Sequence, residues 1–277
     1  VVGGVCWRPA LAARDVFALQ GIPFIASGVR YGGLTDDEMP DILRINGRDD
    51  EQGGFLADAL IDGALDELIG GSLRQRPLVI LYTDGSYGRT LAEEVRESAN
   101  DAGLEVAMYE AFEPDEGMLE AASRAQAEDP GLVMVLAGQA DSALMVSALR
   151  DELGDTPILA GDSVLTPEFP LLAGEGAEGV VFARPTVWRE HVKVDDLVAL
   201  EGEEMGGLLG LVAPSIAATQ IALAQALGQS EAPYDTVLGA LMFKANGDVL
   251  LPGFELWQWR AGTVWPLDSE RIEADPS

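Results

Sequence analysis

Side chains that could do catalytic or metal chemistry are sparse in this sequence. His191 is the one histidine and Cys6 the one cysteine, so no zinc site of the usual His/Cys type can be assembled. A Cys–His nucleophile pair remains formally open. However, Cys6 ends an apolar stretch, where it is expected to pack as a small hydrophobic residue, and His191 is expected at the surface. The sequence therefore predicts no metal and no cofactor.

One glycine pattern, Gly174-Glu-Gly-Ala-Glu-Gly179, has the spacing of a dinucleotide-binding loop. In such loops the glycines follow a strand and open a helix, whereas these precede the apolar residues 180–183. We interpret the pattern as a turn. The sequence also lacks a Gly-x-Ser-x-Gly elbow and a phosphate-binding P-loop. We predict that the protein is not an enzyme, and a hydrolase or transferase on a Rossmann-like fold is the weakened alternative.

The charge is lopsided, with 47 acidic residues against 17 basic ones and a formal net charge of −30. Nucleic acid is excluded as a partner because affinity for a phosphate backbone rests on clustered lysine and arginine. The excess is interpreted as a solvated acidic shell that favours a soluble monomer, and a salt-rich habitat is an alternative origin. No apolar run approaches the ~20 residues of a membrane helix, so no membrane insertion is expected.

Short apolar runs alternate with amphipathic stretches, which is typical of parallel βαβ units. The expected strands are Val1–Cys6, Pro23–Ser27, Ile42–Asn46, Pro77–Thr83, Glu105–Phe112, Leu132–Ala137, Pro157–Ala160 and Gly179–Ala183. The expected helices are Ala10–Leu19, Gln52–Ile69, Tyr87–Ala102, Met118–Ala127, Asp141–Leu153 and Met205–Leu227. Two further strand-like segments, Val237–Phe243 and Phe254–Arg260, are expected to be joined by an Asn246-Gly247 turn.

This pattern predicts an α/β fold with two doubly wound parallel-sheet lobes. The stretch from Gly70 to Pro77 is interpreted as a crossing between the lobes, and the closing tail as a return across their boundary. The expected first lobe comprises 1–73 and 186–238, and the second comprises 74–185 and 239–277.

Several strings resemble the type I periplasmic binding proteins, above all the leucine/isoleucine/valine-binding family of ABC importers. The resemblance covers nearly the whole chain, and its most particular parts are the Asp84-x-x-Tyr-Gly88 and Leu172-Ala-Gly-x-x-Ala-Glu-Gly179 strings. Other matches are Gly21-Ile-Pro-Phe-Ile-Ala-Ser-Gly28, Arg48-Asp-Asp-Glu-Gln-Gly53, Val79–Gly88, Pro157–Asp162, Asn246-Gly-Asp248 and Trp257-Gln-Trp-Arg260.

The resemblance implies a type I periplasmic-binding-protein fold in which two lobes close by a hinge on a ligand in the cleft between them. It implies a solute-binding component of an ABC importer that captures an amino-acid-like, amide or carboxylate ligand. The implied partner is an ABC transporter permease and the implied location is the periplasm. A ligand-sensing regulatory module on the same fold and a degenerate, non-binding remnant are the alternatives.

The resemblance also implies site residues. Asp162 matches the carboxylate that holds the ligand's α-ammonium group, and Tyr87 matches a tyrosine that closes over the ligand. The alternative for Tyr87 is local packing at a helix start. Gln139 stands where an aromatic residue often lines the pocket.

At the carboxylate-binding end, the chain departs from the family pattern. Trp7, followed by Arg8, replaces a serine, and Arg30 replaces a threonine after Gly28-Val29; these five residues are the candidate ligand contacts at this end. Arg30 is expected either to grip a carboxylate bidentately or to point into solvent. Trp7 is expected either to stack on a planar ligand or to pack in the wall between the lobes.

The family begins with two further βα units before the strand matched by Val1–Cys6, so the first lobe is expected to be N-terminally incomplete, with an unpaired sheet edge. The resemblance implies that the usual disulfide partner of Cys6 belongs to that missing part. The region from Val187 to Asp235 is expected to be shortened.

Overall fold

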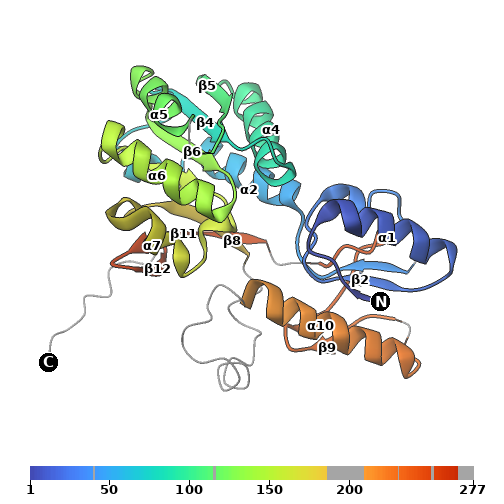
Figure 1. Cartoon of the computed structure of the whole chain (residues 1–277). Helices are drawn as coiled ribbons and strands as arrows, with labels where there is room; N and C mark the ends of the chain where they lie inside the picture. The colour runs from blue at the N-terminus through green and yellow to red at the C-terminus, as the bar shows by residue number, and fades with distance from the viewer. Residues whose placement is uncertain (40, 115–116, 186–208, 230, 251–252, 268–277) are drawn as a thin grey trace, which may run out of the picture. The chain divides into compact units, whose positions relative to one another are not determined.

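The computed structural model describes residues 1–39, 41–114, 117–185, 209–229, 231–250 and 253–267 (Figure 1). The chain divides into two compact units, and two separate stretches of sequence build each unit. Unit 1 comprises Val1–Glu51 and Pro185–Gly253, and unit 2 comprises Gln52–Arg184 and Phe254–Ser277. His191, which was predicted to lie at the surface, is outside the described residues.

The core of unit 2 is a seven-stranded sheet in the order β12-β11-β8-β7-β6-β4-β5. Strands β4 to β8 pair in parallel, whereas β11 and β12 are antiparallel. The bounds are β4 Leu78–Tyr82, β5 Val106–Ala111, β6 Leu132–Leu136, β7 Ile158–Ala160, β8 Val181–Pro185, β11 Phe254–Arg260 and β12 Thr263–Pro266.

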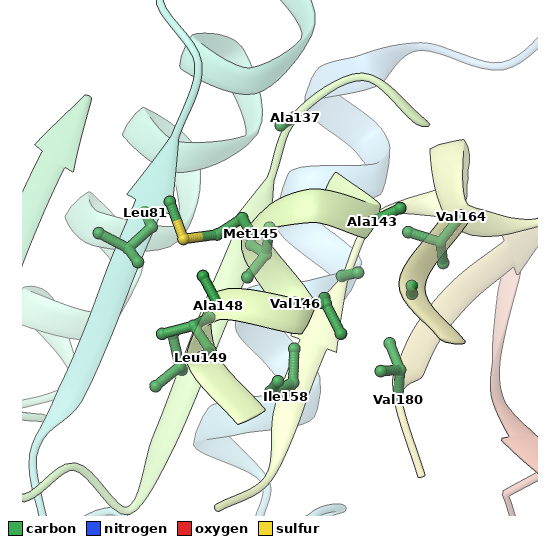
Figure 2. Close-up of a cluster of buried hydrophobic side chains, with 14 of the residues drawn as sticks. Leu81, Ala137, Ala143, Met145, Val146, Ala148, Leu149, Ile158, Val164 and Val180 are labelled. Carbon is green, nitrogen blue, oxygen red and sulfur yellow. The ribbon is translucent and has the colours of Figure 1, made fainter. Parts of the chain in front are cut away.

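Helices cover both faces of this sheet because alternate residues of each strand point to opposite faces. In β4, Val79 and Leu81 pack with α5 (Met118–Ala127), α6 (Gln139–Leu153) and α7 (Glu168–Ala173). Figure 2 shows Leu81 in this cluster beside Met145 of α6. On the other face, Leu78 and Ile80 pack with α2 (Asp49–Ile61), α3 (Asp66–Ile69) and α4 (Ser86–Asp101).

Unit 1 contains a three-stranded parallel sheet in the order β1-β2-β3, formed by Val2–Gly3, Phe24–Ala26 and Ile42–Arg44. Helix α1 (Trp7–Leu19) covers the face that carries Phe24 and Ala26. Helix α10 (Leu209–Ala226) packs with Ile25, on the opposite face. A separate antiparallel pair joins β9 (Tyr234–Thr236) and β10 (Gly239–Leu241).

The late segment 247–249 returns to β3 and pairs with it beside Arg44. Arg44 is fully buried, and its Nε donates to Oδ1 of Asp248 over 2.8 Å. Burial tends to raise the pKa of Asp248, but Arg44, Thr35 and Asn246 stabilise its charged form, so its pKa lies below the ordinary value. This buried ion pair fixes the return of the chain to unit 1.

Most elements confirm the predicted pattern, since each of the eight strands expected before residue 185 has a counterpart. The predicted helix Gln52–Ile69 is interrupted, because α2 ends at Ile61 and Gly63 takes a positive φ of 76°. Residues 205–208 of the expected helix Met205–Leu227 lie outside the described residues. Strands β9 and β12 were not predicted. No described helix is long and apolar enough to span a membrane.

The division between the units differs from the predicted boundaries in two places. Residues 52–73 belong to unit 2, because Leu56 and Leu60 of α2 pack with Leu78 of β4. Residues 239–253 belong to unit 1, because Leu241 and Val249 pack with its core. The interpretation of 70–77 as a crossing between lobes is therefore corrected: the first boundary falls inside α2.

The Asn246-Gly247 turn is confirmed, but the prediction of the strands that it joins was wrong. The turn connects Phe243 with Val249, which form an antiparallel bridge within unit 1. Strand β11, which was expected on the far side of this turn, belongs to the sheet of unit 2.

Candidate functional site

The carboxyl ends of β4, β6 and β7 lie at one edge of the unit 2 sheet because these strands run in parallel. Three segments that carry polar side chains begin at this edge. They are α4 after β4, α6 after β6, and the short helix η2 (Asp162–Val164) after β7. In open parallel sheets, ligands bind outside the carboxyl ends of the strands, so this edge is the candidate site of unit 2.

Tyr87 and Asp162 meet at this edge. The hydroxyl of Tyr87 donates a 2.9 Å hydrogen bond to Oδ1 of Asp162, and the backbone N–H of Ser163 donates to that hydroxyl over 3.3 Å. Both side chains are partly buried. The structure thus brings the two predicted residues into contact, and the Tyr87 hydroxyl orients the Asp162 carboxylate.

Two glycines allow this close approach. A Cβ at Gly161 would lie 2.1 Å from the Tyr87 hydroxyl oxygen. A Cβ at Gly88 would lie 2.4 Å from the carbonyl oxygen of Leu136, so only glycine lets the first turn of α4 pack against the end of β6. The Tyr-Gly string of the sequence thus has a steric reason.

Gln139 is the first residue of α6, and its side chain is partly exposed at the same edge. Behind it, the hydroxyls of Ser142 and Ser163 both donate to the carbonyl oxygen of Ala137, at 3.1 and 2.7 Å. These bonds connect the segments that follow β6 and β7, and they fix the backbone on which Gln139 and Asp162 stand.

In unit 1, the corresponding edge carries the other predicted residues. Trp7 opens α1 after β1, and Gly28 follows β2, donating its N–H to the Gly4 carbonyl over 3.0 Å. A Cβ at Gly28 would lie 3.0 Å from that same oxygen, so the two loops touch backbone to backbone. Cys6, expected to be packed, is exposed, because it stands at the N-cap of α1 rather than in β1.

Two of the predicted ligand contacts in unit 1 are corrected. The side chain of Val29 is 1% exposed and belongs to the core under α1, so it is not available to a ligand. Arg30 does not point into solvent, because its side chain is largely buried. Its guanidinium group is also engaged by Asp49, since Nε lies 3.1 Å from Oδ1 of that residue.

Arg8 differs from Arg30 because its side chain is exposed. Its guanidinium carbon lies 5.0 Å from the centroid of the Trp7 ring. Among the residues that the structure describes, Arg8 forms no ion pair. It is therefore the predicted cation of unit 1 whose charge is open to an anionic group.

Sequence reasoning missed Tyr31, whose ring centroid lies 4.9 Å from that of Trp7. It also missed Arg44 and Asp248, although Asn246-Gly-Asp248 was among the matching strings. An arginine inside the apolar strand Ile42–Asn46 was the available signal, because a buried arginine requires an acidic partner.

No group of three or more His, Cys, Asp and Glu side chains in the described ranges could hold a metal ion. What the unit 2 edge offers is a carboxylate with an oriented phenol beside it. Such a pair can accept hydrogen bonds from an ammonium or amide group.

Comparison with known proteins decides the family. The model of the family described as periplasmic binding protein matches residues 1–199. The chain belongs to the periplasmic binding protein family. Its members are solute-binding proteins rather than a class of enzymes.

Individual relatives agree with this membership of the periplasmic binding protein family. The Leu/Ile/Val-binding protein homolog 3 of Brucella melitensis biotype 1 is 20% identical over 284 residues, which cover 97% of this chain and 74% of that protein. The leucine binding protein LivK of Thermotoga maritima MSB8 superimposes with a TM-score of 0.76 at 18% identity, covering 96% of this chain and 77% of that one.

A third similar structure contains a bound molecule. The solute binding protein of an ABC transporter of Rhodopseudomonas palustris, solved in complex with benzoate, superimposes with a TM-score of 0.75 at 16% identity, covering 96% of this chain and 76% of that chain. These superpositions confirm the predicted α/β periplasmic-binding-protein fold.

Proposed function

We propose that this periplasmic binding protein captures a small amino-acid-like, amide or carboxylate ligand and delivers it to an ABC transporter permease. The observation that carries the proposal is the Tyr87–Asp162 pair at the carboxyl edge of the unit 2 sheet. Family membership supports the transport role, because relatives are Leu/Ile/Val-binding proteins and ABC substrate-binding proteins. The family also supports a periplasmic location.

Asp162 is proposed to bind the ammonium or amide end of the ligand. Its Oδ1 already accepts the Tyr87 hydroxyl hydrogen bond, so an incoming N–H donor meets a carboxylate that is held in one orientation. A charge-assisted hydrogen bond to a partly buried carboxylate is about twice as strong as a neutral one. Gln139, at the start of α6, supplies a further amide group at this edge.

Within unit 1, Arg8 and the backbone around Gly28 are proposed to bind a carboxylate group. Arg30 is not assigned this role, since Asp49 neutralises it. The protein has a net charge of −30, so its many acidic residues repel a small anion. An exposed arginine without an ion-pair partner among the described residues is therefore a favourable binding position for the anion.

Isothermal titration and thermal unfolding of the chain, with leucine, glutamine, phenylalanine, benzoate and succinate as probes, test the proposal. A ligand that binds only the folded state at about a hundred times its Kd adds about 2.7 kcal/mol of stability. Asp162→Asn should abolish the response to the amino acids. Asp101→Asn, at the distant end of α4, is the matched control and should leave the response unchanged. Absence of any response in the folded protein would refute the proposal.

A further inference from the structure

A pair of aromatic rings stands at the candidate edge of unit 1. The ring centroids of Trp7 and Tyr31 lie 4.9 Å apart with an interplanar angle of 40°. Trp7 follows β1 and Tyr31 follows β2, so both lie beyond the carboxyl ends of parallel strands, where open sheets bind ligands. Both side chains are partly buried against the core that contains Val29.

Buried arginines hold the segment that carries Tyr31. Arg44 Nη1 donates to the Tyr31 carbonyl oxygen over 2.6 Å. Arg14 Nη1 donates to the carbonyl oxygens of Gly33 and Leu34, at 2.9 and 3.2 Å. Arg44 is fully buried and Arg14 is 7% exposed, so these donors are themselves fixed by packing. The segment is therefore preorganised, which lowers the entropy that binding costs.

The ring of Tyr31 also packs against the backbone of Gly33. A Cβ at Gly33 would lie 2.6 Å from Cε1 of Tyr31, so the ring lies directly over the position that a side chain would occupy. Arg8 packs over the Trp7 ring at 5.0 Å and restricts the second member of the pair. Two rings held in this way form a rigid aromatic wall.

We infer that the Trp7–Tyr31 pair is the specificity-determining wall of this binding protein and selects ligands with a planar, aromatic or conjugated group. The inference rests on the proposed function, since it names the class of ligand that this binding protein takes. Aromatic pairs in offset or tilted contact attract one another beyond the effect of the area that they bury. An aliphatic side chain of the same size gains only the area term.

Matched ligand pairs test this inference by isothermal titration of the full chain. Benzoate is compared with cyclohexanecarboxylate, and phenylalanine with leucine, because each pair shares its polar groups and differs in the planar ring. Within at least one pair, the planar member should bind about fivefold more tightly, which corresponds to about 1 kcal/mol.

Four variants test whether the Trp7–Tyr31 pair causes the preference for planar ligands. Trp7→Leu and Tyr31→Leu should bring the affinity ratio close to one, whereas Tyr31→Phe keeps the ring and should retain the ratio. Gly33→Ala leaves both rings in the chain but displaces Tyr31, so it should also lower the ratio. Tyr109→Phe, in the separate Tyr82–Tyr109 ring pair of unit 2, is the control and should change nothing.

The outcomes separate the two proposals. If leucine and cyclohexanecarboxylate each bind as tightly as their planar partners, the aromatic inference is overturned and the proposed function stands. A planar preference that survives both Tyr31→Leu and Gly33→Ala also overturns it, because another surface then selects the ring. If none of the four compounds binds the folded chain, the inference falls together with the amino-acid and carboxylate function.

Discussion

The guanidinium of Arg44 and the carboxylate of Asp248 form a buried ion pair across 204 residues of sequence. Arg44 stands in β3, and Asp248 comes from the last stretch that belongs to unit 1. Thr35 and Asn246 donate further hydrogen bonds to Asp248, both at 2.7 Å, so the carboxylate is almost saturated with donors. This arrangement connects the stability of unit 1 to the geometry of its candidate edge, since Arg44 also binds the Tyr31 carbonyl oxygen.

Removing one partner of this pair should destabilise unit 1 strongly. Asp248→Asn leaves the buried Arg44 charge uncompensated, which costs about 3–5 kcal/mol. Urea unfolding measures the change. The exposed pair of Lys244 and Glu51 is the control, and Lys244→Met should cost no more than about 1 kcal/mol. Equal losses in both variants would contradict the importance of burial.

The same carboxylate should make stability depend on acid. The pKa of Asp248 is lower in the folded protein than its ordinary value of 3.8, so the unfolded chain takes up the proton first as pH falls. The stabilisation is thus fully present above the unfolded pKa and is lost as pH falls through the folded pKa. Unfolding free energies at a series of pH values below about 5 should decline less steeply in Asp248→Asn than in Asp101→Asn.

Gly247 should not tolerate a side chain. Its φ is +89°, and a Cβ there would lie 1.9 Å from the carbonyl oxygen of Ile42. Gly262 has a similar φ of +75° but nothing within 4 Å of its Cβ position. Gly262→Ala should therefore cost only the left-handed strain of about 1–2 kcal/mol. Gly247→Ala should lower the stability measured by thermal unfolding clearly more than Gly262→Ala does. Equal losses would show that residues 247–249 can move to accommodate the methyl group.

Gly161→Ala should weaken ligand binding without removing a polar group. The new methyl would lie 2.1 Å from the Tyr87 hydroxyl oxygen and must displace it from Asp162. We expect the affinity for an amino acid ligand to fall by about tenfold, which corresponds to the loss of one hydrogen bond to a charged group. Titration with the best ligand of the panel measures this change. Gly85→Ala is the control because its Cβ would meet nothing within 4 Å.

Arg8 and Arg30 should separate binding from stability. Arg30→Met leaves the largely buried Asp49 without this partner and should lower the unfolding temperature. Arg8→Met removes an exposed charge and should lower affinity for a carboxylate ligand with little change in unfolding temperature. The reverse pattern, with binding lost only in Arg30→Met, would restore the role that the sequence suggested for Arg30.

The sheet of unit 2 could be predicted because local pattern and tertiary position agree there. Strands such as Leu132–Leu136 are apolar at every position, which is typical of parallel strands covered on both faces. The unit boundaries were harder to predict, since α2 is continuous across the boundary and only its packing partner, Leu78, shows where Leu56 belongs.

The position of Asp162 at the edge of the unit 2 sheet was predictable because this residue follows strand β7 almost directly. It was not predictable where a distant partner decides the role of a residue. Nothing near Arg30 in the sequence indicates that Asp49 takes its charge, and nothing near Trp7 indicates that Tyr31 lies against it. These relationships depend on how α1 and the loop after β2 pack together, and local sequence patterns do not indicate that packing.

The split composition of unit 1 has a consequence for biosynthesis. During translation, Arg44 leaves the ribosome long before Asp248, so the nascent chain holds this cation without the carboxylate that makes its burial tolerable. The sheet of unit 1 cannot close in its final form until 247–249 has been made. Release of the chain before that point would yield a polypeptide in which Arg44 of unit 1 lacks the carboxylate of Asp248. Cellular quality control would therefore recognise such a product as incompletely folded.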